Sequence, residues 1–457
     1  MTTTEVYVGA SAAVIGRAMA DGRLDPVEFT ECLLEKISAQ ESPIFLEVTT
    51  NRARKEAMAA RERLKELRPR SALDGVPIAW KDLIDMEGEV TTAASDLLRK
   101  APPAEHDAPI VLHAAAAGLV SLGKLNMTEF AYSGIGLNPH YGTPLNPRAT
   151  DAPRAPGGSS SGSGVAVASG LAPIAIGTDT GGSVRIPAAF NGVTGYKSSE
   201  GRISTKGVFR LSPTLDTVGP LAQTVEDCVL TDQILRGCVG GSTACAIPRD
   251  LTIFVPEGVV LEGLEEEVAA NFDATLYRLA AAGVTVSRGL APEFEEAVRL
   301  AEEIGTITAA EAYVEHRSRV DGTDRGRIDR RVVARIDAGK SMQAAALIRL
   351  QRARAAAMAS LTRRLDGAFI AMPTAPHVAP RIAPLEADDN VFHAVNLKTL
   401  RNTAIGNFLN LPGIAIPNGA GEAGMPTSFL MSAPSGADDA LLGAALALEH
   451  TIRGVAA

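Results

Sequence analysis

Apolar and polar positions follow a helical period over much of the first 70 residues. In residues 27–37, VEFTECLLEKI, apolar side chains recur three and four positions apart. Asp25 and Pro26 precede this run, and proline is favoured at the first position of a helix. Residues 48–67, VTTNRARKEAMAARERLKEL, predict another helix with its charges on one face. We therefore expect N-terminal helices over about residues 10–70.

Short apolar runs appear later in the chain and alternate with amphipathic segments. Residues 251–258, 264–283 and 284–290 read as a strand, a helix and a second strand. FIAMP from 369 and GIAIP from 413 predict short buried strands. We expect one α/β domain over 1–457, with a central mixed β-sheet covered by helices on both faces.

Residues 293–365 are helical in pattern and rich in arginine, with a turn-like break at 321–324. We expect a helical, lid-like excursion over about 290–365 that lies above the functional site, whose candidate residues are described below. Seven arginines gather there: Arg317, Arg319, Arg325, Arg327, Arg330, Arg331 and Arg335. A solvated helical face explains them more simply than an anion-steering lid does.

Composition narrows the class of protein. The chain has 457 residues, 46% of them hydrophobic and 21% charged, which is typical of a globular protein. The net charge of −9 argues against nucleic acid as a partner, because such binding depends on Lys and Arg. The four cysteines have no CxxC spacing and favour free thiols in a cytoplasmic protein. No apolar run approaches the ~18 residues of a membrane helix, so no membrane association is expected.

The Gly- and Ser-rich stretch 150–200 carries the candidate chemistry. Apolar segments interrupt it, which a disordered linker would not show. Gly158-x-Ser160-x-Gly162 formally matches the nucleophile elbow of α/β-hydrolases. That motif needs a buried strand directly before it, and the prolines of 151–156 exclude a central strand there. The elbow interpretation is therefore weak.

The stretch 176–187, IGTDTGGSVRIP, has a different pattern. An apolar run ends at Gly-Gly-Ser and a helix is expected to follow, so successive N–H groups can converge on one point. A phosphate-binding loop would need the same geometry, but the Gly-Lys-[ST] of the Walker pattern is absent. A serine in this turn could be a nucleophile if a base lay within reach.

Two kinds of residue could supply that base. None of the seven histidines lies in a recognisable base motif. A lysine can serve if burial keeps it neutral, and Lys81 ends the apolar run Ile78-Ala-Trp-Lys81. The alternative is a strand-end lysine paired with Asp82 or Asp85. The residues alone leave this choice about even.

With these motifs in order, the chain resembles the amidase signature family. The four matching motifs are 75–85, 123–130, 157–160 and 177–187, and the tail segment 410–417 also fits. The likeness extends over about residues 10–450 and is weakest in the excursion. Four separated motifs in one order are far more specific than any one alone. The resemblance implies the amidase signature fold and hydrolysis of amide-like C–N bonds without a cofactor or a metal.

The resemblance also implies a role for each site residue. Ser183 would be the nucleophile, Ser159 the serine that relays its proton, and Lys81 the general base. The family carries the serine that matches Ser159 on a cis peptide bond. The oxyanion hole would come from the backbone N–H groups of Thr180, Gly181, Gly182 and Ser183. Around this triad, Asp179 and Arg185 would pair to brace the loop, and Ser160 would support Ser159.

The substrate is less defined than the reaction. Alkyl amides, aryl amides and carbamates share the scissile bond, so an amidase and a urethanase both fit. We expect the pocket to be lined by Phe130, Tyr132 and Gly134 of the apolar segment 128–142, although both aromatic rings could equally pack in the core. The oligomeric state stays open, with a homodimer among the options.

A different functional class is the alternative. The chain could be the A subunit of a tRNA-dependent amidotransferase, which needs a partner protein. The resemblance implies Arg-Gln-Pro after the nucleophile in that class, whereas this chain has Arg185-Ile-Pro187. A third class, a binding module without catalysis, would leave the Ser-Ser-Lys set unexplained.

Overall fold

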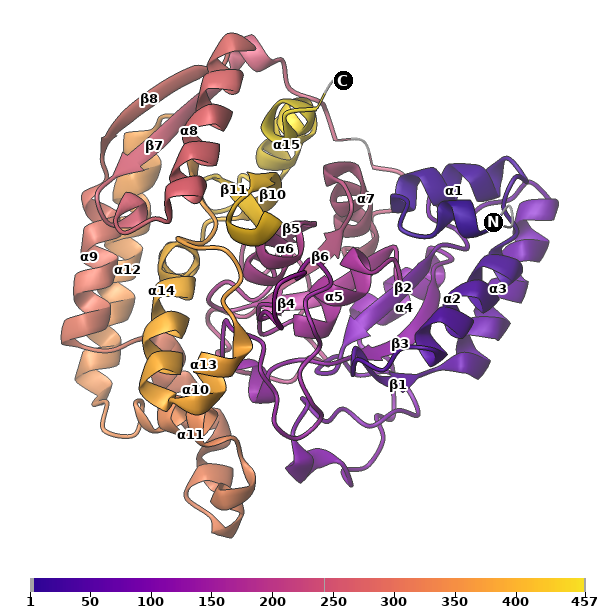
Figure 1. Cartoon of the computed structure of the whole chain (residues 1–457), viewed down its shortest axis with the longest axis horizontal. Helices are drawn as coiled ribbons and strands as arrows, with labels where there is room; N and C mark the ends of the chain where they lie inside the picture. Colours follow the sequence, from indigo (N-terminus) through magenta and orange to yellow (C-terminus); the bar gives the residue numbers. More distant parts are fainter. Residues whose placement is uncertain (1–3, 242, 456–457) are drawn as a thin grey trace.

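A computed structural model describes residues 4–241 and 243–455, and a single mixed β-sheet runs through it (Figure 1). Within the described residues the sheet has eleven strands in the order β1-β3-β2-β4-β6-β5-β10-β11-β9-β7-β8. The strands are β1 Phe45–Val48, β2 Pro77–Lys81, β3 Val120–Leu125, β4 Ile174–Asp179, β5 Thr194–Lys197, β6 Thr217–Ala222, β7 Thr252–Glu257, β8 Thr285–Leu290, β9 Phe369–Pro373, β10 Gly413–Ala420 and β11 Pro426–Ser432.

Helices surround this sheet. In chain order they are α1 Ala12–Ala20, α2 Pro26–Ser38, α3 Thr50–Lys65, α4 Pro109–Ala116, α5 Ser161–Ala168, α6 Arg185–Asn191, α7 Val225–Leu235, α8 Glu266–Ala281, α9 Pro292–Glu303, α10 Ile307–Val320, α11 Arg330–Asp337, α12 Ala344–Leu365, α13 Ile382–Ala387, α14 Asp389–Phe408 and α15 Asp438–Arg453. None of the helices described is both long and apolar enough to cross a membrane.

Both faces of the sheet are covered, as the alternating side chains along its strands show. In β9, Phe369 and Ala371 pack into one hydrophobic cluster with side chains of α7, α8 and α15. The intervening Ile370 and Met372 pack into another cluster, with side chains of α9, α12 and α14. Because successive strand residues point to opposite faces, the two clusters lie on opposite sides of the sheet. The expected α/β class with a mixed, doubly covered sheet is confirmed.

The N-terminal elements follow the pattern of the sequence. α2 begins at Pro26, and the Asp25 side chain caps it by accepting the N–H groups of Val27 and Glu28. α3 lies where the charged amphipathic pattern placed it. The short strand β1 separates the two helices and was not expected. It is an edge strand of four residues, none of them fully buried, so it lacks a strong apolar signal.

The strand–helix–strand unit of residues 251–290 is present as β7, α8 and β8, and the two strands are parallel. From α9 to α12, residues 292–365 form a helical excursion, which Figure 1 shows along one side of the molecule. Within it, α9 packs on α12 and also contacts α14, while α10 packs on α11.

Two adjacent parallel strands position the residues of the candidate site. β2 pairs in parallel with β4, so their carboxyl ends lie at the same edge of the sheet. Lys81 is the last residue of β2, and Asp179 is the last residue of β4. α5 packs against both strands and begins directly after Ser160. Residues about 100 positions apart in the sequence therefore meet at one edge.

Candidate active site

Lys81 lies at the centre of the candidate site and is fully buried. Its Nζ lies 2.7 Å from the Oγ of Ser159 and 2.9 Å from the Oγ1 of Thr178. Burial lowers the pKa of Lys81 to about 7, although the carboxylates of Asp216 and Asp179 oppose this. With a pKa of about 7, the lysine is neutral in a large fraction of molecules near neutral pH, and its Nζ is within hydrogen-bond distance of two hydroxyl groups.

Ser159 is placed by backbone contacts on either side of it. The peptide bond from Gly158 to Ser159 is cis. Gly158 donates its N–H to the carbonyl of Gly134 at 2.8 Å, and the Ser159 carbonyl accepts the N–H of Thr128 at 3.0 Å. Segment 128–134 and the loop that carries Ser159 thus hold one another in place.

Ser160 links the two serine loops. Its N–H donates to the carbonyl of Ser183 at 3.3 Å, and its hydroxyl donates to the carbonyl of Thr178 at 3.4 Å. The loops that carry Ser159 and Ser183 are consequently in direct contact. Ser183 itself precedes α6 and lines a cavity with Thr180 and Gly181.

The Asp179 carboxylate organises the turn that carries Ser183. It forms a fully buried ion pair with Arg185, whose Nη2 lies 2.9 Å from Oδ1. It also accepts the N–H groups of Gly182 at 2.8 Å and Val184 at 3.1 Å. Burial alone would raise the pKa of the Asp179 carboxyl, but Arg185, with help from Lys197 and Asn407, holds that pKa well below its usual range.

One backbone N–H of the turn is already engaged. Gly182 donates its N–H to the Asp179 carboxylate, so this group of the expected oxyanion hole already has an acceptor. Two side chains fix this turn from outside. Thr180 donates its hydroxyl to Asp216 at 2.5 Å, and Thr403 donates its hydroxyl to the carbonyl of Gly181 at 2.7 Å.

The cavity has a volume of about 720 Å³ and is mostly apolar in its lining. Ser183 and Tyr132 belong to this lining, which also includes Leu211, Leu215 and Leu350. Elements from both halves of the chain contribute, including the excursion and α14. A cavity of this size suits a small organic substrate beside the serine.

The residues expected to form the pocket fall in different places. Tyr132 lines the cavity. Phe130 is buried in the core, where it stacks on Phe209 and His316, and it does not contribute to the described cavity lining. Gly134 also lies outside the lining, and a Cβ on it would meet the side chain of Leu400. The alternation of apolar residues in 128–142 could not distinguish these positions.

Three polar neighbours of the site carry weak or absent sequence signals. Thr178 lies within the stretch 176–187, but nothing in the pattern singles it out as the second hydroxyl at Lys81. Asn407 donates to Asp179 at 2.9 Å from a helix more than 200 residues away. Asp216 binds Thr180, and burial raises the pKa of its carboxyl to about 6. Only the folded chain brings Asn407 and Asp216 to the site.

Other side chains that could bind a metal ion or act as a base are few in the part of the chain that the structure describes. Among the residues that the structure describes, no group of three or more His, Cys, Asp or Glu side chains is placed to hold a metal ion. His316 is buried, and burial lowers its pKa to about 3, so it is a neutral partner in an aromatic stack. Lys124, which is also buried at this sheet edge, pairs with Asp82 at 3.0 Å. Lys81 has no such carboxylate contact in the described chain.

Comparison with known proteins agrees with this geometry. The Amidase family model matches residues 28–442, and the chain belongs to this family. It is 34% identical to 2-amino-5-chloromuconic acid deaminase of Comamonas testosteroni, over 88% of this chain and 87% of that protein. It is 33% identical to the A subunit of the glutamyl-tRNA(Gln) amidotransferase of Roseiflexus castenholzii, over 93% and 92% of the two chains.

A solved structure supports the same conclusion. A crystal structure of an amidase superimposes with a TM-score of 0.84 at 29% identity and covers 97% of this chain and 99% of that one. The similarity to the amidase signature family expected from the motifs is confirmed. The protein is an amidohydrolase of the amidase family, which acts on C–N bonds.

Proposed function

We propose that the chain is a stand-alone amidase that uses Ser183, Ser159 and Lys81 as its catalytic triad. The contact of 2.7 Å between Lys81 Nζ and Ser159 Oγ carries this proposal, because it joins a lysine of lowered pKa to a buried serine whose loop contacts the loop of Ser183. Such a lysine can act as a general base near neutral pH. The substrate is a small-molecule amide or carbamate.

The proposed reaction proceeds through an acyl-enzyme. Ser183 Oγ attacks the substrate carbonyl carbon while its proton passes to Ser159, whose own proton passes to neutral Lys81. The carbonyl oxygen becomes an oxyanion, which the N–H groups of Thr180, Gly181 and Ser183 stabilise. The C–N bond then breaks, and the relay returns the proton to the departing nitrogen. Water releases the acyl group by the same steps.

The neighbouring residues support these groups without reacting. Asp179 and Arg185 fix the turn before Ser183, and Ser160 holds the two serine loops together. Thr178 gives Lys81 a second hydroxyl neighbour. These contacts keep the reacting atoms in one arrangement, which is a main source of rate acceleration in such sites.

Substitution of Lys81 tests the triad. Lys81→Ala should lower the acylation rate by about 100-fold or more, the range of general-base removal. Lys81→Arg should be about as inactive, because a guanidinium stays protonated. Lys206→Ala, which removes an exposed lysine outside the site, is the matched control. A Lys81→Arg enzyme with near-normal turnover would rule out the Ser-Ser-Lys mechanism.

A second candidate comes from the relatives. The similarity to the A subunit of an amidotransferase extends over 93% of this chain, so a role as one component of a complex is the alternative. The two functions differ in what the chain does alone. We expect the purified chain, without a partner, to hydrolyse members of a panel of alkyl amides, anilides and carbamates. Activity that appears only with a partner protein would favour the alternative.

A further inference from the structure

Arg335 on α11 differs from the other arginines of the excursion. It lines the same cavity as Ser183. Arg317, Arg325, Arg327, Arg330 and Arg331 form ion pairs with carboxylates. Arg319 has no carboxylate partner among the described residues, but it lies over the rings of Phe130 and Phe209 and outside the cavity lining. No carboxylate of the described residues pairs with Arg335. Its Nε is buried and has no hydrogen-bond partner in the described chain. The excursion therefore places one unsatisfied cation in the cavity wall.

The surroundings of Arg335 are apolar and aromatic. Its guanidinium carbon lies 4.4 Å from the centroid of the Tyr132 ring, a distance typical of a cation–π contact. Burial lowers the pKa of Arg335, which reports the cost of removing the charge from water. Arg335 is half-buried, and its buried Nε without a partner is unfavourable. A bound carboxylate with its two oxygens would match the guanidinium fork.

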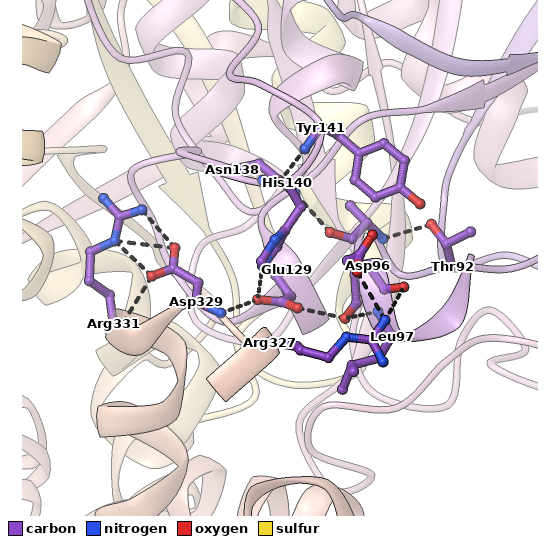
Figure 2. Close-up of polar contacts among 12 residues, drawn as sticks. Thr92, Asp96, Leu97, Glu129, Asn138, His140, Tyr141, Arg327, Asp329 and Arg331 are labelled. Atoms are coloured by element: carbon purple, nitrogen blue, oxygen red, sulfur yellow. Dashed lines mark hydrogen bonds and ion pairs between the residues drawn. The ribbon is translucent and has the colours of Figure 1, made fainter. Parts of the chain in front are cut away.

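The position of Arg335 is fixed by the anchoring of α11. The Asp329 side chain caps this helix, and the Asp329 N–H donates to Glu129 at 2.6 Å (Figure 2). Glu129 also accepts from Ser95 at 2.5 Å and lies 3.1 Å from His140 Nε2. From α11, Val332 and Ile336 join the hydrophobic cluster that contains Tyr132. The helix is thus held against segment 129–132, and Arg335 faces the cavity.

The other charged side chains of the cavity do not satisfy Arg335. Glu262 and Glu302 are both exposed to solvent. Burial lowers the pKa of Arg401 as well, and the charge of Glu262 opposes this. Unlike Arg335, Arg401 donates to the side chain of Asn402 and the carbonyl of Val260. Lys398 is exposed. Arg335 is therefore the cation of the cavity lining that combines a buried donor with an aromatic platform.

We propose that Arg335 binds a carboxylate of the substrate, so that the enzyme prefers amides whose acyl part carries a second, negatively charged carboxyl group. This inference rests on the proposed function and assigns the substrate class of the same site. The scissile carbonyl reaches Ser183 while the remote carboxylate contacts Arg335 over Tyr132. Binding energy from such a non-reacting group orients the reacting bond.

A matched pair of substrates tests the preference. The probes are the monoamides of four-, five- and six-carbon dicarboxylic acids and the methyl esters of the same monoamides, which keep the size but lose the charge. For the acid of best length, kcat/KM should exceed that of its ester by about 10-fold or more. Arg335→Gln should lower this acid-to-ester ratio by about 10- to 100-fold, mainly through KM. Arg335→Lys should retain part of the ratio.

The control variant is Arg349→Gln. Arg349 is an exposed residue of the same excursion outside the cavity lining, so its loss changes the net charge equally. It should leave the acid-to-ester ratio within about 2-fold. A wild-type enzyme that prefers the esters, or an Arg335→Gln variant with an unchanged ratio, would overturn the inference.

Binding without turnover separates this inference from the proposed function. Calorimetry on Ser183→Ala with the dicarboxylic monoamide measures the subsite alone. Binding that weakens about 10-fold or more in Ser183→Ala/Arg335→Gln supports the subsite even if no amide is hydrolysed. Turnover of neutral amides together with equal binding by both variants would leave the proposed function intact and refute the subsite.

Discussion

Thr178 and Lys81 face each other across two parallel strands, with the threonine Oγ1 2.9 Å from the lysine Nζ. The lysine therefore has two hydroxyl neighbours, and in the proposed triad Ser159 is the one that relays the proton. Thr178→Val keeps the shape and removes one hydrogen bond of about 0.5–1.5 kcal/mol. We expect kcat to fall by about 2- to 13-fold while KM changes little. Steady-state kinetics checks this, and a loss as large as that of Lys81→Ala would place Thr178 in the proton relay.

The pKa of Lys81 sets the acid limb of the pH profile. In the proposed mechanism the neutral form of Lys81 is the base, and this form dominates above the pKa of about 7. We therefore expect kcat/KM to rise with pH through about 7 and to level off above it. Residual activity of Lys81→Ala should lack this limb. A wild-type profile that is flat between pH 6 and pH 8 would contradict the assignment of the base.

The two glycines before Ser183 should respond differently to a methyl group. A Cβ at Gly181 would meet no atom within 4 Å, whereas a Cβ at Gly182 would lie 2.3 Å from Thr403 Oγ1, at a φ of +134°. We expect Gly182→Ala to lower the free energy of unfolding by about 1–3 kcal/mol. Gly181→Ala should unfold like the wild type in urea. Equal destabilisation of both variants would contradict this geometry.

The buried pair of Arg185 and Asp179 should be costly to break. Arg185→Met leaves the Asp179 carboxylate buried without its cation, which typically costs about 3–5 kcal/mol. Urea unfolding followed by circular dichroism measures the change. Arg317→Met, at a mostly exposed arginine whose contact with Asp321 is 3.7 Å long, is the control and should change stability by less than about 1 kcal/mol.

Glu129 should affect substrate affinity through α11. Glu129→Ala removes the acceptor of the Asp329 N–H and frees the start of the helix that carries Arg335. We expect KM for a carboxylate-bearing amide to rise by about 10-fold, with a smaller change in kcat. Asp96→Asn weakens the neighbouring but solvent-exposed ion pair with Arg327 (Figure 2) and should have little effect. Similar effects of both variants would show that α11 does not depend on Glu129.

Much of the fold follows from local patterns. The start of α2 at Pro26 and the β7–α8–β8 unit could be predicted because capping residues and apolar periodicity are local properties. Lys81, Ser159 and Ser183 could be singled out because each lies in a distinctive short motif. The sequence left the role of Lys81 open between a base and a strand-end lysine paired with Asp82 or Asp85. Its burial and its contact with Ser159 favour the base.

Other features depend on contacts between distant segments. Asn407 reaches Asp179 and Arg185 only after α14 has packed beside the sheet, and no pattern around residue 407 indicates this. Phe130 and Tyr132 are neighbours in sequence, yet one stacks in the core and the other lines the cavity. Arg335 belongs to a run of arginines that looked uniformly solvated. The direction in which a helix presents each side chain is fixed by tertiary packing.

The parallel pairing of β2 with β4 gathers the proposed reacting groups in one part of the chain, and the proposed carboxylate subsite lies in another. The groups proposed to break the bond lie between residues 81 and 183, whereas Arg335 and much of the rest of the cavity wall come from residues after 290. Mutations in the later segment can redirect the enzyme to new amides while the reacting groups stay unchanged. Exchange of residues 292–365 between homologues is therefore a practical route to altered selectivity in a biocatalyst of this type.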